Sequence, residues 1–256
     1  MSKQIASGAV VARILLSTAT LLCTATALVT LTAVLDLGSC GPALGLPSAE
    51  IESLTKHLDA HKQVLTPIAK ALTFSHTKAY DEDFQSACQS GHEAIDKALA
   101  SGSGKSLAIV SDLDETLLDN RPFFEKIESK SEDQISWDDF ESWQKTVKAK
   151  PLKPTEDLLA YARSKGVAVF FVTGRMERLR RVTIENLLKY GIAYDGLYMR
   201  ANGDEQDAST MKSAYRKQIE DMGFEIVVNI GDQYSDLQGG HGLDCEKLPN
   251  KIYFIH

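Results

Sequence analysis

Two aspartates, one residue apart, follow a short apolar stretch near the middle of the chain. Leu-Ala-Ile-Val at 107–110 has the pattern of a buried strand, and Asp112 and Asp114 come just after it. Because side chains alternate along a strand, both carboxylates should begin on the same side of the backbone. Two such charges repel each other unless a cation or a shared proton relieves them. The pair therefore indicates an aspartyl nucleophile with a neighbouring acid/base beside Mg²⁺, an ion that prefers oxygen ligands. A solvated acidic loop is the alternative that this stretch alone leaves open.

Apolar runs and helical patterns alternate along the chain from residue 106 onwards. This alternation predicts an α/β fold, in which helices cover both faces of a parallel sheet, preceded by an N-terminal helical extension. The predicted strands are 107–110, 167–172, 196–200, 225–230 and 251–255. The predicted helices are 51–68, 81–100, 135–150, 155–165 (capped by Thr155), 177–190 and 210–222.

Further polar residues follow the predicted strands. Thr173 and Arg175 come after the strand 167–172, and Asp232 comes after the strand 225–230. Right-handed crossovers place the loops after parallel strands at one edge of the sheet, which is where ligands bind in such folds. We therefore expect Thr173 and Asp232 to share one pocket with the two aspartates, and Arg175 to lie beside that pocket as a candidate substrate-binding residue.

The N-terminus has the composition of an export signal. Lys3 and Arg13 are the only charged residues before Asp36, and residues 14–35 are apolar. The sequence just before Cys40 resembles the bacterial lipobox, in which the cysteine becomes lipidated. A lipoprotein signal, an uncleaved membrane anchor and a simply cleaved signal all remain open. Each alternative predicts an exported protein of the periplasm or cell envelope, and the first two attach it to the membrane.

We predict three segments along the chain. Residues 1–39 form the signal peptide or membrane anchor, and residues 40–105 form a linker with N-terminal helices. Residues 106–256 form the core, interrupted by a helical insertion at about 120–155. Within that insertion, aromatic residues at helical spacing are expected to be core rather than ligand-binding: Trp137, Phe140 and Trp143.

Composition limits the possible partners. The chain has 256 residues, a formal net charge of −7 and no stripe of Lys and Arg interleaved with aromatics, so a nucleic acid polymer is not expected as a partner. Four cysteines, at 23, 40, 88 and 245, lack the paired spacing of a zinc site. A Cys88–Cys245 disulfide and free buried thiols both remain open.

Taken in order, four motifs resemble those of the haloacid dehalogenase (HAD) superfamily of phosphatases. They are Asp-Leu-Asp-Glu-Thr at 112–116, Thr173, Lys212, and Gly-Asp at 231–232 with Asp236. Longer matches, Asp-Glu-Thr-Leu-Leu-Asp-Asn and Asn-Ile-Gly-Asp-Gln-Tyr-Ser-Asp-Leu, and Lys-Leu-Pro-Asn near the C-terminus, look like the class B/class C acid phosphatase group. That group includes bacterial outer-membrane lipoprotein acid phosphatases and plant vegetative storage proteins. The resemblance covers roughly residues 48–256 and implies a HAD-like Rossmannoid sheet.

The resemblance implies a role for each residue of these motifs. Asp112 would be the nucleophile that forms an aspartyl-phosphate, and Asp114 would protonate the leaving alcohol and then deprotonate water. Thr173 would donate a hydroxyl to a phosphoryl oxygen, and Lys212 would balance the charge of the nucleophile and the phosphoryl group.

Mg²⁺ is the expected cofactor. Asp112, Asp232 and, by resemblance, the backbone carbonyl of Asp114 would supply its protein ligands. Asp236 lies four residues beyond Asp232 and is expected to act on the metal through a water.

The expected function is an exported, Mg²⁺-dependent acid phosphatase acting on small phosphomonoesters. Phe123 and Tyr234 are candidates for stacking a nucleobase, which with the resemblance suggests nucleoside monophosphates. For Phe123 and its neighbour Phe124, the alternative is burial against the helix that carries Trp137 and Trp143. The alternative functions are a non-catalytic storage or binding protein on the same fold, which Asp112 disfavours, and a phosphotransferase.

Overall fold

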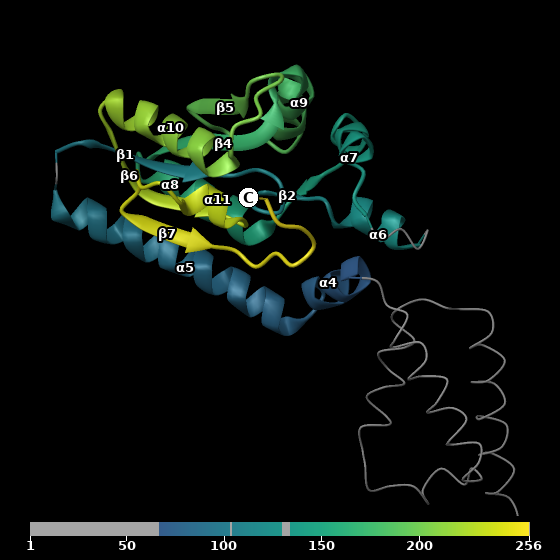
Figure 1. Ribbon diagram of the computed structural model, residues 1–256. Coiled ribbons are helices and arrows are strands. Elements are labelled where there is room, and N and C mark those ends of the chain that lie inside the picture. The colour runs from purple at the N-terminus through teal and green to yellow at the C-terminus, as the bar shows by residue number, and fades with distance from the viewer. Residues whose placement is uncertain (1–66, 103, 130–133, 256) are drawn as a thin grey trace, which may run out of the picture. The chain divides into compact units, whose positions relative to one another are not determined.

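A parallel five-stranded sheet forms the centre of the computed structural model, which describes residues 67–102, 104–129 and 134–255 (Figure 1). The strands are β1 (Ser106–Ser111), β4 (Ala168–Met176), β5 (Gly196–Arg200), β6 (Phe224–Gly231) and β7 (Asp244–Lys247). Their order across the sheet is β5-β4-β1-β6-β7, and every neighbouring pair is parallel. The predicted α/β fold with a parallel sheet is confirmed.

Alternate side chains of the central strands enter two separate cores. Leu107 and Ile109 of β1 belong to a cluster with residues of α5 and α8, whereas Ala108 and Val110 belong to a cluster with α10. This is the alternation that a strand buried on both faces requires. The strand β1 is therefore packed on both faces up to its last residue, Ser111, which precedes Asp112.

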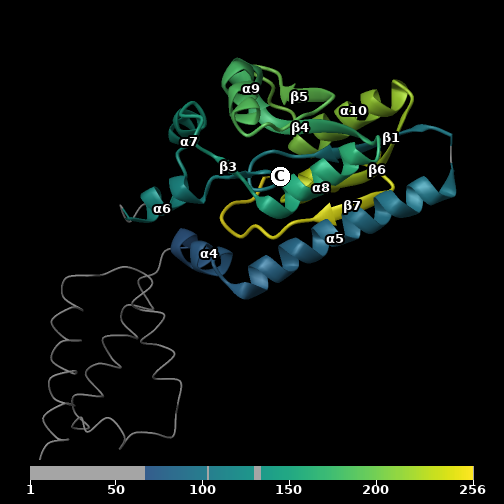
Figure 2. The same cartoon turned by 180° about the vertical axis from the view of Figure 1, so that it is seen from behind.

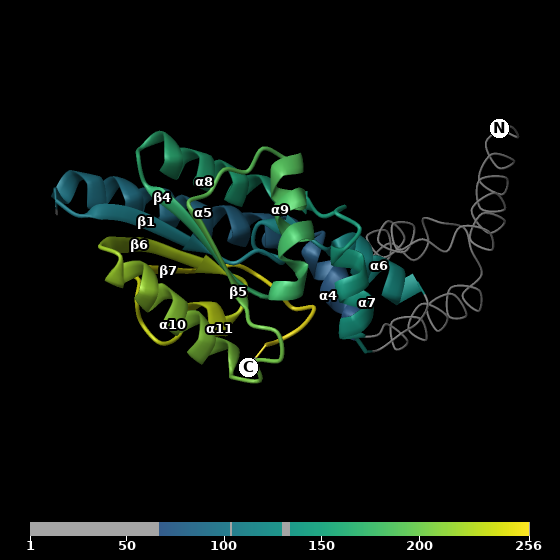
Figure 3. The ribbon, with the colours of Figure 1, turned by 90° about the horizontal axis from the view of Figure 1, so that it is seen from above.

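Helices cover both faces of the sheet. In Figure 3, α5 (Lys78–Ser101) and α8 (Lys153–Ser164) lie on one side, and α10 (Ala208–Asp221) and α11 (Tyr234–Leu237) lie on the other. Figure 2 shows the first of these faces from behind. Helix α4 (Pro67–Ser75) precedes α5, and a short 3₁₀ turn, η2 (Glu177–Leu179), leads into α9 (Arg180–Lys189) after β4.

A helical insertion lies beyond the end of the sheet at which β1 finishes (Figures 1 and 2). Its base is a two-stranded antiparallel ribbon of β2 (Leu118–Asp119) and β3 (Lys150–Pro151), and between them come α6 (Arg121–Ser129) and α7 (Trp137–Gln144). Ser136 begins α7 by accepting a hydrogen bond from the Asp139 N–H. The ribbon keeps both ends of the insertion close to the loop that follows β1.

The predicted fifth strand, 251–255, is wrong. The fifth strand is β7, which pairs with β6 through Val228 and Asp244 at the start of the ladder. The apolar residues of 251–255 are used elsewhere, because Tyr253 packs against Phe124 and Phe140 of the insertion. A polar edge strand next to an apolar non-strand segment inverts the pattern on which the prediction relied.

The start of α8 also differs from the prediction. The helix begins at Lys153 rather than after Thr155, because Pro154 fits its first turn instead of breaking the chain. Thr155 is fully buried within that turn and lies 3.9 Å from the Cys88 sulfur. It therefore packs in the core and does not cap the helix.

The two cysteines within the described residues are free. Cys88 is buried and Cys245 is exposed, so the disulfide alternative is not formed. The signal or anchor predicted at 1–39 lies outside the described residues, and so does Cys40. The helix predicted over 51–68 also lies outside them, except for its last two residues. Within 67–102, 104–129 and 134–255, no helix is both long and apolar enough to span a bilayer.

Candidate active site

Asp112 follows directly from β1 and is fixed by its backbone. Its N–H donates to the Ile230 carbonyl of β6 at 3.0 Å, which continues the strand ladder by one residue. The side chain is 7% exposed, and Oδ1 accepts a hydrogen bond from Lys212 Nζ at 2.9 Å. Burial raises the pKa of the Asp112 carboxyl well above its ordinary value, and the Lys212 ammonium opposes that rise.

Lys212 joins two carboxylates across the site. It projects from α10, is 5% exposed, and forms ion pairs with both Asp112 and Asp236. Burial by itself would lower the pKa of Lys212, but the charges of these two carboxylates raise it above its ordinary value. The side chain is therefore a fixed cation beside Asp112.

Three buried carboxylates form one cluster. Asp112, Asp232 and Asp236 each place an oxygen within 4.8 Å of the others. Gly231 makes this arrangement possible, because a Cβ at its position would overlap the Asp236 side chain. Asp236 also accepts a hydrogen bond from the Gln233 N–H at 2.7 Å, which begins helix α11.

Asp232 is held by donors from three parts of the chain. Thr116 Oγ1 contacts Oδ1 at 3.1 Å, while Gln233 Nε2 and Asn250 Nδ2 each donate to Oδ2 at 2.6 Å. Burial and the neighbouring Asp236 charge raise the pKa of Asp232 to about 6, although Asn250 and Gln233 lower it. The donors orient this carboxylate towards the cluster without neutralising it.

Asp114 lies inside a cage of four donors. Arg175 donates from Nε to Oδ2 at 2.9 Å and from Nη2 to Oδ1 at 2.6 Å. Asn120 Nδ2 reaches Oδ1 at 2.8 Å, and Gln144 Nε2 reaches Oδ2 at 3.1 Å. All four acceptor positions of the carboxylate are thus occupied by N–H groups.

Arg175 is not free to bind a substrate as expected. Its side chain has no exposed surface and pairs with Asp114, and Nη1 donates to Thr183 at 3.2 Å. Thr173, 1% exposed, comes two residues earlier on β4, and its hydroxyl accepts the Arg175 N–H at 3.2 Å. The strand end therefore supplies a partner for Asp114 instead of an open cation.

The two candidate stacking residues differ in exposure. Phe123 is 6% exposed and its ring lies against those of Phe124, Phe140 and Trp143. The burial alternative therefore describes Phe123, and stacking by this ring is not supported, because no face of it is open. Tyr234 is 65% exposed and has only the Lys247 ammonium over its ring, at 5.2 Å from the centroid, among the aromatic and cation contacts of the described chain.

Most of the chain matches a known protein family. Residues 43–256 match the family described as HAD superfamily, subfamily IIIB (acid phosphatase). The chain belongs to this family. The resemblance inferred from the four motifs is confirmed.

Two plant proteins are among the relatives of this subfamily IIIB chain. Acid phosphatase 1 of Solanum lycopersicum is 38% identical over 151 residues, covering 57% of this chain and 58% of the relative. Vegetative storage protein 1 of Arabidopsis thaliana is 30% identical over 151 residues, covering 57% of this chain and 54% of the relative. The matched stretches thus span little more than half the length of either plant protein.

The fold is also that of a solved bacterial structure. The class C acid phosphatase from Bacillus anthracis superimposes with a TM-score of 0.64 and 24% sequence identity, over 75% of this chain and 87% of that one. At this identity the likeness is one of fold.

Members of the HAD family generally use a divalent metal, and the buried carboxylates of this chain fit one. Around Asp112, Asp232 and Asp236 gather two more buried carboxylates, Asp114 and Glu115. Among the described residues, the buried cations that form ion pairs with these carboxylates are Lys212 and Arg175. Burial raises the pKa of Glu115, as it does that of Asp112. Oxygen donors with an excess of negative charge are the environment that a hard divalent cation requires.

Several residues of the site escaped the sequence analysis. Asn120 and Asn250 stand in the quoted motifs, at the ends of Asp-Glu-Thr-Leu-Leu-Asp-Asn and Lys-Leu-Pro-Asn, so the motifs themselves were a signal for them. Gln233 stands beside Asp232 in a third motif. Gln144 has no local signal, since only the folding of the insertion brings it to Asp114.

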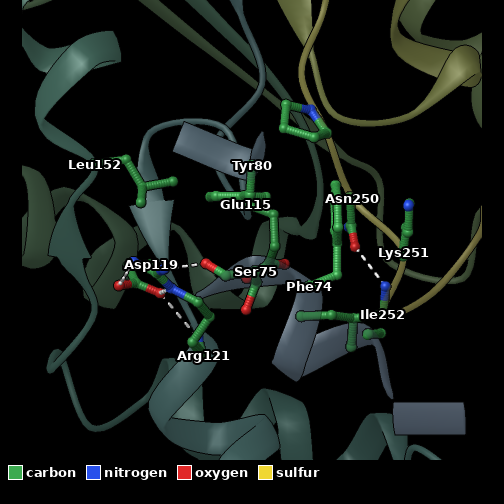
Figure 4. Close-up of a pocket in the computed structure, with 12 residues that line it drawn as sticks. Phe74, Ser75, Tyr80, Glu115, Asp119, Arg121, Leu152, Asn250, Lys251 and Ile252 are labelled. Carbon is green, nitrogen blue, oxygen red and sulfur yellow. Dashed lines mark hydrogen bonds and ion pairs between the residues drawn. The ribbon is translucent and has the colours of Figure 1, made fainter. Parts of the chain in front are cut away.

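A small pocket lies next to the site but outside the carboxylate cluster (Figure 4). Glu115 and Asn250 line it, together with Tyr80 of α5 and Arg121 of α6. Its lining does not include Asp112, Asp114, Asp232 or Asp236. Arg121 is bound there by Asp119 and by the Ser75 carbonyl, the latter at 3.0 Å. The pocket therefore belongs to the packing behind Glu115 and not to the reacting centre.

Proposed function

We propose that the chain hydrolyses small phosphomonoesters through a phosphoryl group held on Asp112. The observation that carries this proposal is the Asp112–Lys212 pair, a buried carboxylate fixed at a strand end beside a permanent cation. A storage role would need neither this pair nor the Asp114 cage. Membership of an acid phosphatase family supports the same reaction class.

In the first step the Asp112 carboxylate attacks phosphorus. Lys212 contacts Oδ1, so Oδ2 is the attacking oxygen. An O–P bond forms to Asp112 as the O–P bond to the alcohol breaks, and Asp114 supplies a proton to the departing oxygen. Lys212 and the Thr173 hydroxyl stabilise the charge on the phosphoryl oxygens.

In the second step water replaces Asp112 on phosphorus. Asp114, now unprotonated, takes a proton from the attacking water, and the Asp112 carboxylate is released with inorganic phosphate. For its acid role Asp114 must carry a proton on an oxygen that now accepts N–H groups, so at least one of its four donors has to move or turn during the cycle.

Mg²⁺ is the metal that we propose for the carboxylate cluster, with Asp112 and Asp232 as ligands, the Asp114 carbonyl as a third, and Asp236 acting through a water. Bound there, Mg²⁺ supplies Lewis-acid stabilisation of charge on the phosphoryl oxygens. Ser235, whose hydroxyl is buried and lacks a hydrogen-bond partner within the described residues, lies in α11 between Asp232 and Asp236 in the sequence. An orphaned polar atom at this place supports a missing polar occupant.

The test of this function is phosphate release from a panel of phosphomonoesters, with Mg²⁺ and with a chelator. We expect turnover with Mg²⁺ and its loss in chelator. A melting-temperature measurement runs in parallel, because a bound cation should stabilise the fold and a chelator should lower the melting temperature. Full activity in chelator would contradict the metal assignment, and no release from any phosphomonoester would contradict the activity.

Nucleoside monophosphates are the substrate class that we propose, with Tyr234 stacking the base. Tyr234 is an exposed aromatic residue at the start of α11, two residues after Asp232, and stacking on such a ring contributes about 1–3 kcal/mol per base. We expect a higher kcat/KM for a nucleoside monophosphate than for glycerol phosphate, and Tyr234→Ala should remove that preference. Equal kcat/KM values in the wild type would rule out the stacking role.

We also propose export, with membrane attachment through residues 1–39 or through lipid on Cys40. Its support is the basic and apolar composition of this segment. The test is cell fractionation with mass analysis of the mature N-terminus. Cys40→Ser should leave an unprocessed precursor without lipid, whereas a mature N-terminus elsewhere would favour simple cleavage.

A further inference from the structure

The C-terminal end of helix α7 meets the Asp114 carboxylate. Gln144, the last residue of the helix and 7% exposed, donates from Nε2 to Asp114 Oδ2 at 3.1 Å. Its neighbour Trp143 donates from Nε1 to Asn120 Oδ1 at 2.8 Å, and Asn120 donates in turn to Asp114 Oδ1 at 2.8 Å. Two consecutive residues of one helix thus hold Asp114, one directly and one through Asn120.

Helix α7 belongs to the insertion and not to the sheet that positions Asp112. Side chains of η2 and α9 bind the insertion to the core. In α7, Glu141 pairs with Arg178 of η2, whose Nε lies 3.1 and 3.0 Å from the two carboxylate oxygens. After α7, Lys189 Nζ donates to the Val147 carbonyl at 2.8 Å, and Asn186 Nδ2 donates to the Ala149 carbonyl at 2.8 Å. Undocking of α7 would therefore remove Gln144 from Asp114 while β1 stayed in place.

The four donors around Asp114 divide between two bodies. Arg175 provides two of them from β4 of the core. Asn120, at the start of the insertion, and Gln144, near its end, provide the other two. The direction of the carboxylate consequently depends on where α7 sits.

We propose that Gln144 is a positioning residue for the proton transfer carried out by Asp114, so that the leaving alcohol is protonated efficiently only when α7 is docked on the core. An amide suits this place, because its nitrogen donates to a carboxylate and its oxygen accepts from a carboxylic acid. Trp143 positions Asp114 indirectly, because it orients the Asn120 amide that donates to Asp114. Because this role presupposes the phosphatase activity proposed above, the test must separate the two.

The leaving group provides that separation. The parameter kcat/KM covers the steps up to departure of the alcohol, and protonation matters most for an alcohol that is a poor leaving group. Gln144→Met keeps the length of the side chain but removes its N–H donor. We expect kcat/KM to fall about 10- to 100-fold for glycerol phosphate, as for other misplaced catalytic groups, and by less than about threefold for p-nitrophenyl phosphate.

A second variant tests docking at a distance from Asp114. Glu141→Ala removes the pair with Arg178 and keeps a good helix former in α7, so it should give the same selective loss to a smaller degree. Gln218→Met, on the exposed surface of α10, is the matched control and should change neither substrate. The melting temperature of every variant shows whether the fold is retained.

A loss of kcat/KM confined to glycerol phosphate in Gln144→Met supports the positioning role of Gln144. Equal losses on both substrates, or no loss, in folded Gln144→Met protein overturn it while leaving the phosphatase activity intact. A wild-type protein that hydrolyses neither substrate overturns the proposed function itself, and the positioning role with it.

Discussion

Arg175 and Asp114 form a two-pronged ion pair in which the guanidinium has no exposed surface and the carboxylate side chain is 12% exposed. Burial disfavours the charged guanidinium, but the Asp114 charge outweighs it and raises the pKa of Arg175 further above its ordinary value. An arginine beside a phosphate site is usually expected to bind the substrate. Here Arg175 binds Asp114, the proposed acid/base, and thereby orients the side chain that would protonate the leaving oxygen.

Replacing Arg175 should therefore damage both the fold and the reaction. Arg175→Ala leaves the Asp114 carboxylate buried without its cation, and breaking a buried pair in this way costs about 3–5 kcal/mol of unfolding free energy. Arg175→Lys keeps the charge but cannot make two parallel hydrogen bonds, so its unfolding free energy and its kcat/KM should lie between those of the wild type and those of Arg175→Ala. Denaturant unfolding and kcat/KM measure the two effects.

The matched control is Arg163→Ala. Arg163 is partly exposed and pairs with Asp195 at 2.8 Å, and such surface pairs contribute about 1 kcal/mol or less. A comparable stability loss in Arg163→Ala and Arg175→Ala would show that the burial of the Arg175 pair has no special weight.

A methyl group at Gly231 should displace Asp236. In Gly231→Ala the new Cβ would occupy the place of the Asp236 side chain, forcing apart its contacts with Lys212 and the Gln233 N–H. Overpacking of this kind costs about 1–3 kcal/mol. We expect a lower unfolding free energy and a marked loss of phosphate release. Gly174→Ala, where a Cβ meets nothing within 4 Å, is the stability control; equal destabilisation by both would refute the close-approach explanation.

Acid should weaken the contact between α7 and the core. Hydrogen bonds from Arg178 and then Lys145 lower the pKa of Glu141 from its ordinary 4.5 to about 2. A carboxyl with a lowered folded-state pKa adds stability that is complete above pH 4.5 and disappears as the pH falls towards 2. The difference in unfolding free energy between wild type and Glu141→Gln should thus be positive at pH 6 and shrink below pH 4.5. A difference independent of pH over this range would contradict the assignment.

The two described cysteines should differ sharply in reactivity. Burial raises the pKa of the Cys88 thiol to about 12, so it is protonated as well as shielded at pH 8, whereas Cys245 is exposed. Brief treatment with an alkylating reagent, followed by peptide mass mapping, should label Cys245 in the native protein and Cys88 only after unfolding. Rapid native labelling of Cys88 would show that α5 opens readily.

The residues that sequence could place lie at or near the carboxyl end of a strand. Asp112 and Asp232 come directly after β1 and β6, as local patterns of burial predict. Thr173 lies within β4, which continues to Met176 instead of stopping at the predicted residue 172. The order of strands and the common edge then follow from chain handedness. This is why the carboxylate cluster could be anticipated before the fold was known.

The residues that sequence misplaced depend on contacts distant along the chain. Arg175 was expected at the substrate because its partner, 61 residues away, could not be recognised as such. The apolar segment 251–255 looked like a strand because sequence cannot say that Tyr253 faces the insertion instead. Gln144 is one glutamine among several, and its role exists only because α7 docks beside Asp114.

The central claim, a phosphoryl group carried by Asp112, is tested most directly by trapping that group. Asp114→Asn removes the base of the second step, and p-nitrophenyl phosphate needs little help from an acid in the first, so the intermediate should accumulate in this variant. Rapid acid quenching and peptide mass mapping should then find phosphate on Asp112, and none when Asp112→Asn is added. Phosphate on another residue, or continued hydrolysis by Asp112→Asn at a rate near that of the wild type, would contradict the account.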